Sequence, residues 1–153
     1  GRRVICITGE GGLMMNIQEL ATIMHHKLDV KIFVLMNGGY LTIKQTQELG
    51  FEGRLMGVNK DSGLSFPDFS KIAQANGMEN FTTDNPKDLR VDLMQTLYAW
   101  IRPTIHEIIM SPDQPQSPRS VNRRNPDGTM NPTKLEDSFP FLPPEVIEEE
   151  MRL

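Results

Sequence analysis

Two short apolar segments, each followed directly by a glycine-rich turn, constrain the fold of this chain most strongly. Residues 4–8 lead into Gly9-Glu10-Gly11-Gly12, and residues 30–36, apolar apart from Lys31, lead into Asn37-Gly38-Gly39. Short apolar runs rich in β-branched residues and bounded by turns are typical of strands that are buried on both faces of a sheet. We therefore predict two interior strands, each ending in a turn that carries few large side chains.

The segment between these strands has the pattern of an amphipathic helix. Asn16 and Glu19 are spaced as in a capping box, and apolar residues then recur at helical spacing, namely Ile17, Leu20, Ala21, Ile23, Met24 and Leu28. This connection is longer than the roughly dozen residues that a crossover between parallel strands needs. Strand, helix and strand in this order predict a βαβ unit with parallel strands.

Further elements follow in the order expected of an α/β fold. We predict helices over residues 41–49 and 68–76, strands over residues 78–82 and 104–110, and between these strands a longer helix that is capped by Asp84 or Asn85 and ends at Pro103. We expect residues 1–110 to form one domain, a parallel sheet flanked by helices, that lacks its amino-terminal part. Eight of the 11 prolines lie beyond residue 111, which predicts an extended tail over residues 111–153 with an acidic helix at residues 145–152.

The composition excludes several classes of protein. A length of 153 residues, a net charge of −4 and 38% hydrophobic residues fit one soluble domain. No apolar run approaches the roughly 18 residues that span a bilayer, so we expect no membrane association. Mixed charge and a pI of 5.4 argue against a nucleic acid partner. The lone cysteine, Cys6, excludes an internal disulfide and favours the cytoplasm.

Both glycine turns should lie at the same edge of the sheet, because parallel strands end together at their carboxyl ends, where open α/β folds bind ligands. Glu10 offers a carboxylate and Asn37 an amide oxygen, and the first turn leads to the start of a helix, whose free amides favour a phosphate. Oxygen ligands beside a phosphate indicate Mg²⁺. Either turn alone would be an ordinary connection, and only the pair favours a ligand site.

The two turns and the residues around them resemble a known family. Gly9-Glu10-Gly11, followed 27 positions later by Asn37, is similar to the thiamine diphosphate fingerprint of the acetolactate synthase and pyruvate decarboxylase superfamily. The helical segment at residues 15–23 and the residues Lys44-Gln45-Thr46-Gln47 also resemble acetolactate synthases. The resemblance covers about residues 1–110 and implies the diphosphate-binding domain of such an enzyme.

The resemblance implies roles for individual residues, carried over position by position. Glu10 and Asn37 would give side-chain oxygens, and Gly39 its carbonyl, to Mg²⁺. The further residues expected at the cofactor are Gly9, Gly11, Gly12 and Tyr40. The family usually has aspartate in place of Glu10, asparagine in place of Met36, and tryptophan in place of Thr46 near the acceptor substrate.

The same resemblance implies a cofactor-driven reaction on a small 2-oxo acid, such as decarboxylation or carboligation. The glutamate that activates the cofactor would come from a separate pyrimidine-binding domain, generally on a partner subunit of a homodimer or tetramer. This chain alone should then be inactive. Two alternatives remain: a carboligase or lyase with a larger keto-sugar acceptor, suggested by Thr46, and a non-catalytic module that has lost its metal site, suggested by Glu10.

The remaining chemically versatile side chains are expected to be structural. His25 and His26 lie near a helix end, where histidines face solvent or cap carbonyls. His106 lies in a predicted strand, and Cys6 is expected to pack as a small apolar residue. The catalytic residues themselves are not predicted from this chain.

Overall fold

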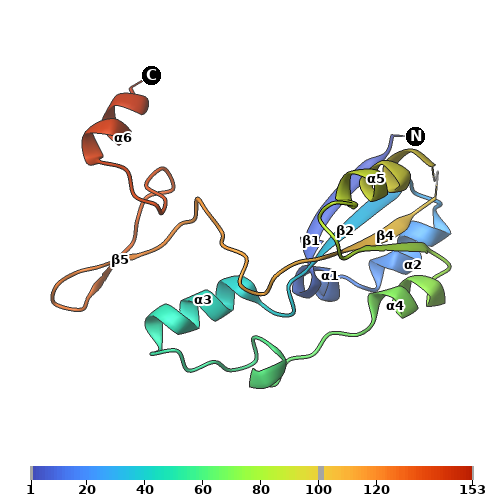
Figure 1. The fold of residues 1–153 in the computed structure, drawn as a ribbon, viewed down its shortest axis with the longest axis horizontal. Helices are drawn as coiled ribbons and strands as arrows, with labels where there is room; N and C mark the ends of the chain where they lie inside the picture. Colours follow the sequence, from blue (N-terminus) through green and yellow to red (C-terminus); the bar gives the residue numbers. More distant parts are fainter. Residues whose placement is uncertain (1, 100–101, 153) are drawn as a thin grey trace. The chain divides into compact units, whose positions relative to one another are not determined.

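The computed structural model describes residues 2–99 and 102–152, and the chain divides into two compact units, Gly1–Gln114 and Pro115–Leu153. The described part of the first unit contains a four-stranded parallel sheet with the strand order β1-β2-β4-β3 (Figure 1). Its strands are β1 (Val4–Gly9), β2 (Val30–Met36), β3 (Glu79–Thr83) and β4 (Thr104–Ile109). The predicted α/β architecture with a parallel sheet flanked by helices is therefore confirmed.

Short helices connect these strands. They are α1 (Glu10–Met15), α2 (Glu19–His25), α3 (Leu41–Gly50), a 3₁₀ turn η1 (Lys60–Ser62), α4 (Phe69–Ala75), and α5 (Leu89–Met94) with a π-helical continuation, η2 (Gln95–Ala99). The crossover from β1 to β2 forms the predicted βαβ unit. Helix α4 begins after Asp68, whose carboxylate accepts a hydrogen bond from the backbone N–H of Lys71, a capping interaction that explains its start.

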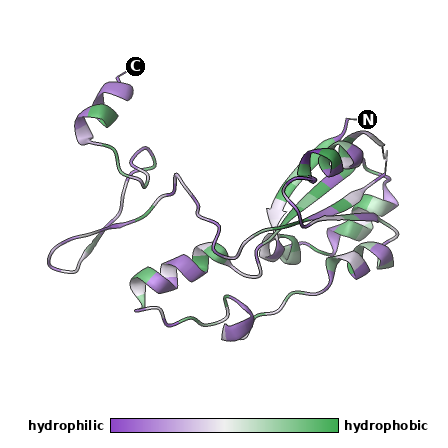
Figure 2. Ribbon diagram, in the orientation of Figure 1, coloured by the Kyte–Doolittle hydropathy of each residue, from purple (hydrophilic) through white to green (hydrophobic). Residues whose placement is uncertain are grey.

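One face of the sheet carries the main hydrophobic core. Alternate residues of the two central strands, such as Val34 and Ile105, point to this face and pack against α1, α2 and α4. The buried cluster consists of Leu13, Leu20, Ile32, Val34, Phe69, Ala73, Met78 and Ile105. Figure 2 shows the hydrophobic strands at the centre of this unit. The core therefore supports the sheet below the ends of β1 and β2.

Strand β1 differs from the prediction of a strand buried on both faces. Val4, Ile5 and Ile7 are each at least half exposed, and Cys6, expected to be packed, is exposed as well. The physical reason is position, because β1 is the edge strand of the described sheet and only β2 lies beside it. An apolar run alone does not distinguish an edge strand from a central one.

Two helix starts also differ from the prediction. The first helix begins at Glu10 instead of after Asn16, so the glycines expected in a turn form the first turn of α1. Helix α2 follows as a separate segment, and no side chain caps it. Helix α5 begins at Leu89, several residues beyond Asp84 and Asn85, because the intervening residues form turns. The helix was predicted to continue to Pro103, and residues 100–101 of this stretch lie outside the described residues.

The second unit contains regular structure within the proline-rich segment. A short antiparallel pair joins β5 (Arg123–Arg124) to β6 (Met130–Asn131), and α6 (Pro144–Glu150) lies where the acidic helix was predicted. Arg123 donates two hydrogen bonds to Asp137, at 2.9 and 3.0 Å, and its guanidinium lies 4.0 Å from the centre of the Phe141 ring. These contacts give the segment internal order.

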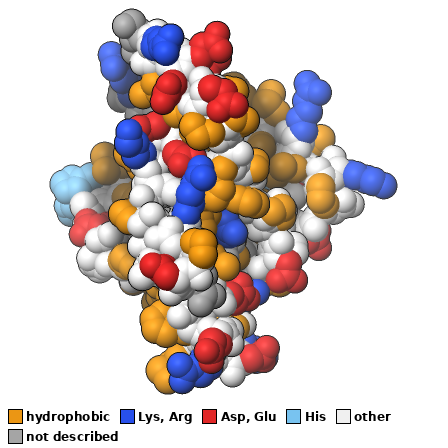
Figure 3. Space-filling model, turned by 90° about the vertical axis from the view of Figure 1, so that its left-hand side faces the viewer, with side chains coloured by type: hydrophobic (Ala, Val, Ile, Leu, Met, Phe, Trp, Pro, Cys, Tyr) orange, Lys and Arg blue, Asp and Glu red, His pale blue; other side chains and the backbone are white. Residues whose placement is uncertain are grey.

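Two surface properties follow from the composition. Figure 3 shows acidic and basic side chains interspersed on the face that it presents, as the mixed charge of the sequence suggests. Within residues 2–99 and 102–152, no helix has the length and apolar character needed to cross a membrane.

Candidate functional site

The predicted meeting of the two turns is present at the carboxyl edge of the sheet. Strands β1 and β2 are paired in register up to Gly9 and Leu35, so the two strands end beside each other at the same edge of the sheet. Glu10 is the first residue of α1, and Asn37 directly follows β2. Residues 27 positions apart are thus brought into contact by the βαβ crossover.

The carboxylate of Glu10 joins the two turns. Its Oε2 accepts a hydrogen bond of 3.0 Å from the backbone N–H of Asn37, and its Oε1 accepts one of 2.9 Å from that of Gly38. The side chain is buried, with 2% of the residue exposed. Burial raises the pKa of Glu10 above its usual value, and the backbone hydrogen bonds oppose this rise because they stabilise the charged form. Glu10 is therefore a buried carboxylate held by two amides.

The second turn is folded on itself. The Oδ1 atom of Asn37 accepts a hydrogen bond of 3.1 Å from the backbone N–H of Gly39, which forms an Asx turn. Gly38 has a φ of +79°, a conformation that glycine adopts without strain. The side chain of Asn37 therefore lies along its own turn, while its backbone N–H binds Glu10.

Glycines allow unusually close contacts around both turns. A Cβ atom on Gly11 would lie 1.9 Å from Cε1 of Tyr40, and one on Gly39 would lie 2.2 Å from the carbonyl oxygen of Val58. The ring of Tyr40 therefore rests on the first turn of α1, and it also packs edge-on against Phe66 at 5.6 Å between ring centres. Tyr40 thus bridges the two turns through its side chain.

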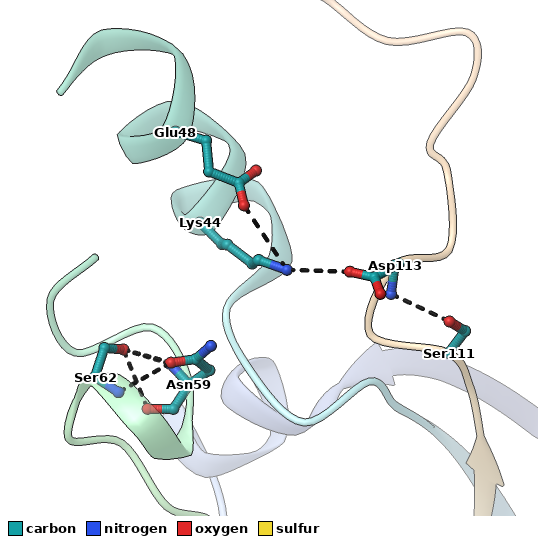
Figure 4. A network of polar contacts seen from close by, with 6 residues as sticks. All are labelled: Lys44, Glu48, Asn59, Ser62, Ser111 and Asp113. Carbon is teal, nitrogen blue, oxygen red and sulfur yellow. Dashed lines mark hydrogen bonds and ion pairs between the residues drawn. The ribbon is translucent and has the colours of Figure 1, made fainter. Parts of the chain in front are cut away.

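A small pocket borders the second turn. Its lining includes Asn37, Gly39, Tyr40, Lys44, Asn59 and Pro112. The ammonium group of Lys44 lies 3.3 Å from a carboxylate oxygen of Asp113 and 3.8 Å from one of Glu48 (Figure 4). The ion pairs of Lys44 connect α3 with the segment that follows β4, so the pocket lies between the ends of β2 and β4.

The donor atoms at this edge fit a hard divalent cation. The described residues contain no group of three His, Cys, Asp or Glu side chains that could enclose a metal ion. Glu10 supplies a carboxylate in which each oxygen uses one lone pair on an amide and retains another. With the amide oxygen of Asn37 and the carbonyl of Gly39, the set consists of oxygen only, and Mg²⁺ commonly completes such a set with phosphates and water.

The three histidines are not part of this site. His25 and His26 are exposed at the end of α2. His106 is fully buried on the opposite face of the sheet, and burial lowers its pKa, partly offset by the negative charge of Asp92. Its two ring nitrogens each lie 2.8 Å from a hydroxyl, those of Thr83 and Thr96.

The hydrogen bonds around His106 define its tautomer. Thr83 gives its only hydroxyl proton to Asp92 in a bond of 2.6 Å, so its oxygen accepts from Nε2–H of His106. The Nδ1 atom then accepts from the hydroxyl of Thr96. This network, in which the imidazole is neutral, connects β4 with β3 and η2, and it supports the prediction that His106 is structural.

Several residues at the site were not predicted. Val58, Asn59 and Ser62 form a turn that contacts the second glycine turn, and Lys44 lines the pocket beside it. The pattern Asn-x-x-Ser at residues 59–62 is a capping signature and was the available signal. Thr46 is exposed on α3, where its hydroxyl bonds to the carbonyl of Thr42.

Comparison with known proteins identifies the class to which this fold and site belong. Residues 1–106 match the family model described as "Thiamine pyrophosphate enzyme, C-terminal TPP binding domain". The chain therefore belongs to the thiamine pyrophosphate (thiamine diphosphate) enzyme family, as the resemblance of its two turns predicted.

Individual relatives specify the similarity further. The chain is 37% identical over 94 residues to the acetolactate synthase large subunit of Buchnera aphidicola subsp. Schlechtendalia chinensis, which is 61% of this chain and 16% of that subunit. It is 33% identical over 96 residues to the isozyme 1 large subunit of Escherichia coli (strain K12), covering 63% of this chain and 16% of the relative. The matches thus span about one sixth of these relatives, and the chain is an acetolactate synthase-like thiamine diphosphate-binding domain.

A solved structure has the same fold. The thiamine diphosphate-dependent 4-hydroxybenzoylformate decarboxylase of Rhodococcus jostii RHA1 superposes with a TM-score of 0.65 at 24% identity, covering 74% of this chain and 21% of that chain. At this level of identity the likeness concerns the fold, and it agrees with the parallel sheet described above.

Proposed function

We propose that this chain binds the diphosphate of thiamine diphosphate through Mg²⁺, as part of a larger acetolactate synthase-like enzyme that acts on a small 2-oxo acid. The contact between Glu10 and the turn at Asn37 carries this proposal. It places a carboxylate, an amide oxygen and closely approachable backbone at one sheet edge, which is what a cation and a diphosphate require together.

The residues of this chain would act by binding and orientation. Glu10, Asn37 and the carbonyl of Gly39 would hold Mg²⁺, and Gly9, Gly11 and Gly12 would bring backbone amides to the phosphates. Tyr40 would limit the space beside Gly11 and keep the two turns together. When bound, thiamine diphosphate supplies the carbon nucleophile that adds to a 2-oxo acid and takes up the electron pair released with carbon dioxide.

The proposal includes a partner domain and an assembly. A pyrimidine-binding domain, contributed by a partner subunit in a homodimer or tetramer, would complete the cofactor site, and the assembled enzyme would work in the cytoplasm. The domain by itself would then bind the diphosphate end of the cofactor without turning over substrate. Because the domain would bind cofactor without turning over substrate, cofactor binding tests the proposal more directly than activity does.

Calorimetric titration of thiamine diphosphate into the full-length protein tests the proposal. We expect binding with Mg²⁺, loss of binding with a chelator, and loss of binding in Glu10→Ala even with Mg²⁺. Glu19→Ala, which removes an exposed carboxylate at the start of α2, is the matched control and should bind normally. Binding that is independent of Mg²⁺ and of Glu10 would contradict the proposed site.

A non-catalytic module is the alternative that one observation favours. Both carboxylate oxygens of Glu10 already accept backbone hydrogen bonds, as a purely structural carboxylate would. The variant Glu10→Asp distinguishes a metal-binding site from a purely structural carboxylate. If the natural protein binds no thiamine diphosphate with Mg²⁺ and the aspartate variant does, the chain is a degenerate member of its family.

A further inference from the structure

Residues 58–59 contact the turn that follows β2, although they lie some 20 positions further along the sequence. The backbone N–H of Tyr40 donates a hydrogen bond of 2.8 Å to the carbonyl of Val58, and Gly39 forms an antiparallel bridge with Asn59. The absence of a side chain on Gly39 makes this approach possible, because a Cβ atom there would lie 2.2 Å from the same Val58 oxygen. The turn is therefore pressed against residues 58–59.

The position of Val58 is in turn set by Ser62. The Oγ atom of Ser62 accepts hydrogen bonds of 3.0 Å from the backbone N–H groups of both Val58 and Asn59. Asn59 closes the arrangement, because its Oδ1 accepts from the backbone N–H of Ser62 at 3.0 Å and from its hydroxyl at 2.7 Å (Figure 4). Val58 is only 1% exposed, so its backbone has little room to move.

These contacts determine the direction of one carbonyl in the proposed metal site. The carbonyl of Gly39 and the N–H of Tyr40 belong to the same planar trans peptide unit, and they point in opposite directions. When the N–H of Tyr40 is bound to Val58, the oxygen of Gly39 is directed away from residues 58–59. A change in the position of Val58 would therefore rotate that oxygen.

We infer that Ser62 is a positioning residue for the bound cation, acting through Val58 on the carbonyl of Gly39. This inference rests on the proposed function, because Gly39 is a ligand only if the site binds Mg²⁺. Mg²⁺ requires nearly ideal octahedral geometry, so a rotated carbonyl weakens its binding. Residues that orient metal ligands typically change metal affinity by about 10–100-fold when they are removed.

Electron paramagnetic resonance of Mn²⁺, a spectroscopic substitute for Mg²⁺, provides the test in the full-length protein with saturating thiamine diphosphate. We expect Ser62→Ala to raise the dissociation constant of Mn²⁺ about 10-fold or more and to change the spectrum of the bound ion. Ser62→Thr retains the hydroxyl and should restore both properties. Ser70→Ala, an exposed serine on α4, is the matched control and should match the natural protein.

The outcomes separate the two proposals. If Ser62→Ala lowers only the melting temperature and leaves Mn²⁺ affinity and spectrum unchanged, while Glu10→Ala abolishes binding, the inference about Ser62 is wrong and the proposed function stands. If the natural protein itself binds no Mn²⁺ with thiamine diphosphate, the proposed function fails first. Should Ser62→Ala not fold, Asn59→Ala removes the capping turn from its other side and should show the same loss of affinity.

Discussion

The carboxylate of Glu10 accepts a hydrogen bond of 3.0 Å from the backbone N–H of Asn37, at the point where the two neighbouring strands β1 and β2 leave the sheet. A second bond to the N–H of Gly38 makes the carboxylate a bridge between the first turn of α1 and the turn after β2. The edge where we propose that the cofactor binds is thus organised by hydrogen bonds within the chain itself. Such preorganisation reduces the ordering that binding must otherwise impose.

Substitution of Gly39 should be costly because its Cβ would meet backbone rather than a movable side chain. We expect Gly39→Ala to lower the free energy of unfolding by roughly 1–3 kcal/mol, the range for overpacked sites. Gly50→Ala is the control, since nothing lies within 4 Å of a Cβ there. It ends α3 and should be neutral or slightly stabilising. Urea denaturation gives both values, and equal effects would contradict the packing argument.

Burial of Phe69 should contribute strongly to stability. This side chain is 0% exposed in the core that supports the site, whereas Phe51 is 54% exposed after α3. We expect Phe69→Ala to lower the free energy of unfolding by about 3–5 kcal/mol, and Phe51→Ala to have a much smaller effect. The comparison uses the same chemical change at two levels of burial, and thermal or urea denaturation measures it. A similar loss in both variants would show that the core is assigned wrongly.

The buried His106 should make stability dependent on pH. Its pKa is lowered from 6.5 by burial, so at mildly acid pH the unfolded chain binds a proton more readily than the folded one. The contribution is fully present above pH 6.5 and decreases as the pH falls from there towards the lower folded-state pKa. We expect the difference in free energy of unfolding between the natural protein and His106→Gln to shrink over this range. A difference that stays constant over this range would contradict the expectation.

Arg123 should organise the second unit through geometry rather than charge alone. Its guanidinium binds Asp137 with two hydrogen bonds and stacks on Phe141, and lysine can reproduce neither the paired bonds nor the planar stacking. We expect Arg123→Lys to increase hydrogen exchange and protease cleavage within residues 115–153. Arg152→Lys, at an exposed position after α6, should leave both unchanged. Unaltered exchange in Arg123→Lys would mean that charge suffices.

Local sequence patterns were enough to predict the sheet, the order of its elements and the approach of Glu10 to Asn37. The spacing of apolar residues, the turn residues and the length of the crossover determine those features. The partners of Glu10 could not be predicted in the same way, because they are backbone amides that carry no side-chain signature. The start of α1 was predicted too late because glycines favour turns, yet here they continue a helix that Glu10 begins. The proposed role of Ser62 in positioning the Gly39 carbonyl could not be predicted either, because it depends on a long-range contact between Val58 and Tyr40.

The exposed edge strand β1 has a consequence for handling this domain. Its residues from Val4 to Gly9 carry no charge, its apolar side chains are exposed, and in the described sheet only β2 pairs with it. Exposed apolar edge strands of this kind act as templates on which further chains add as strands. The strand that leads directly to Glu10 is therefore also the segment through which the isolated domain would aggregate, and a gatekeeper charge in place of Ile5 would suppress that assembly.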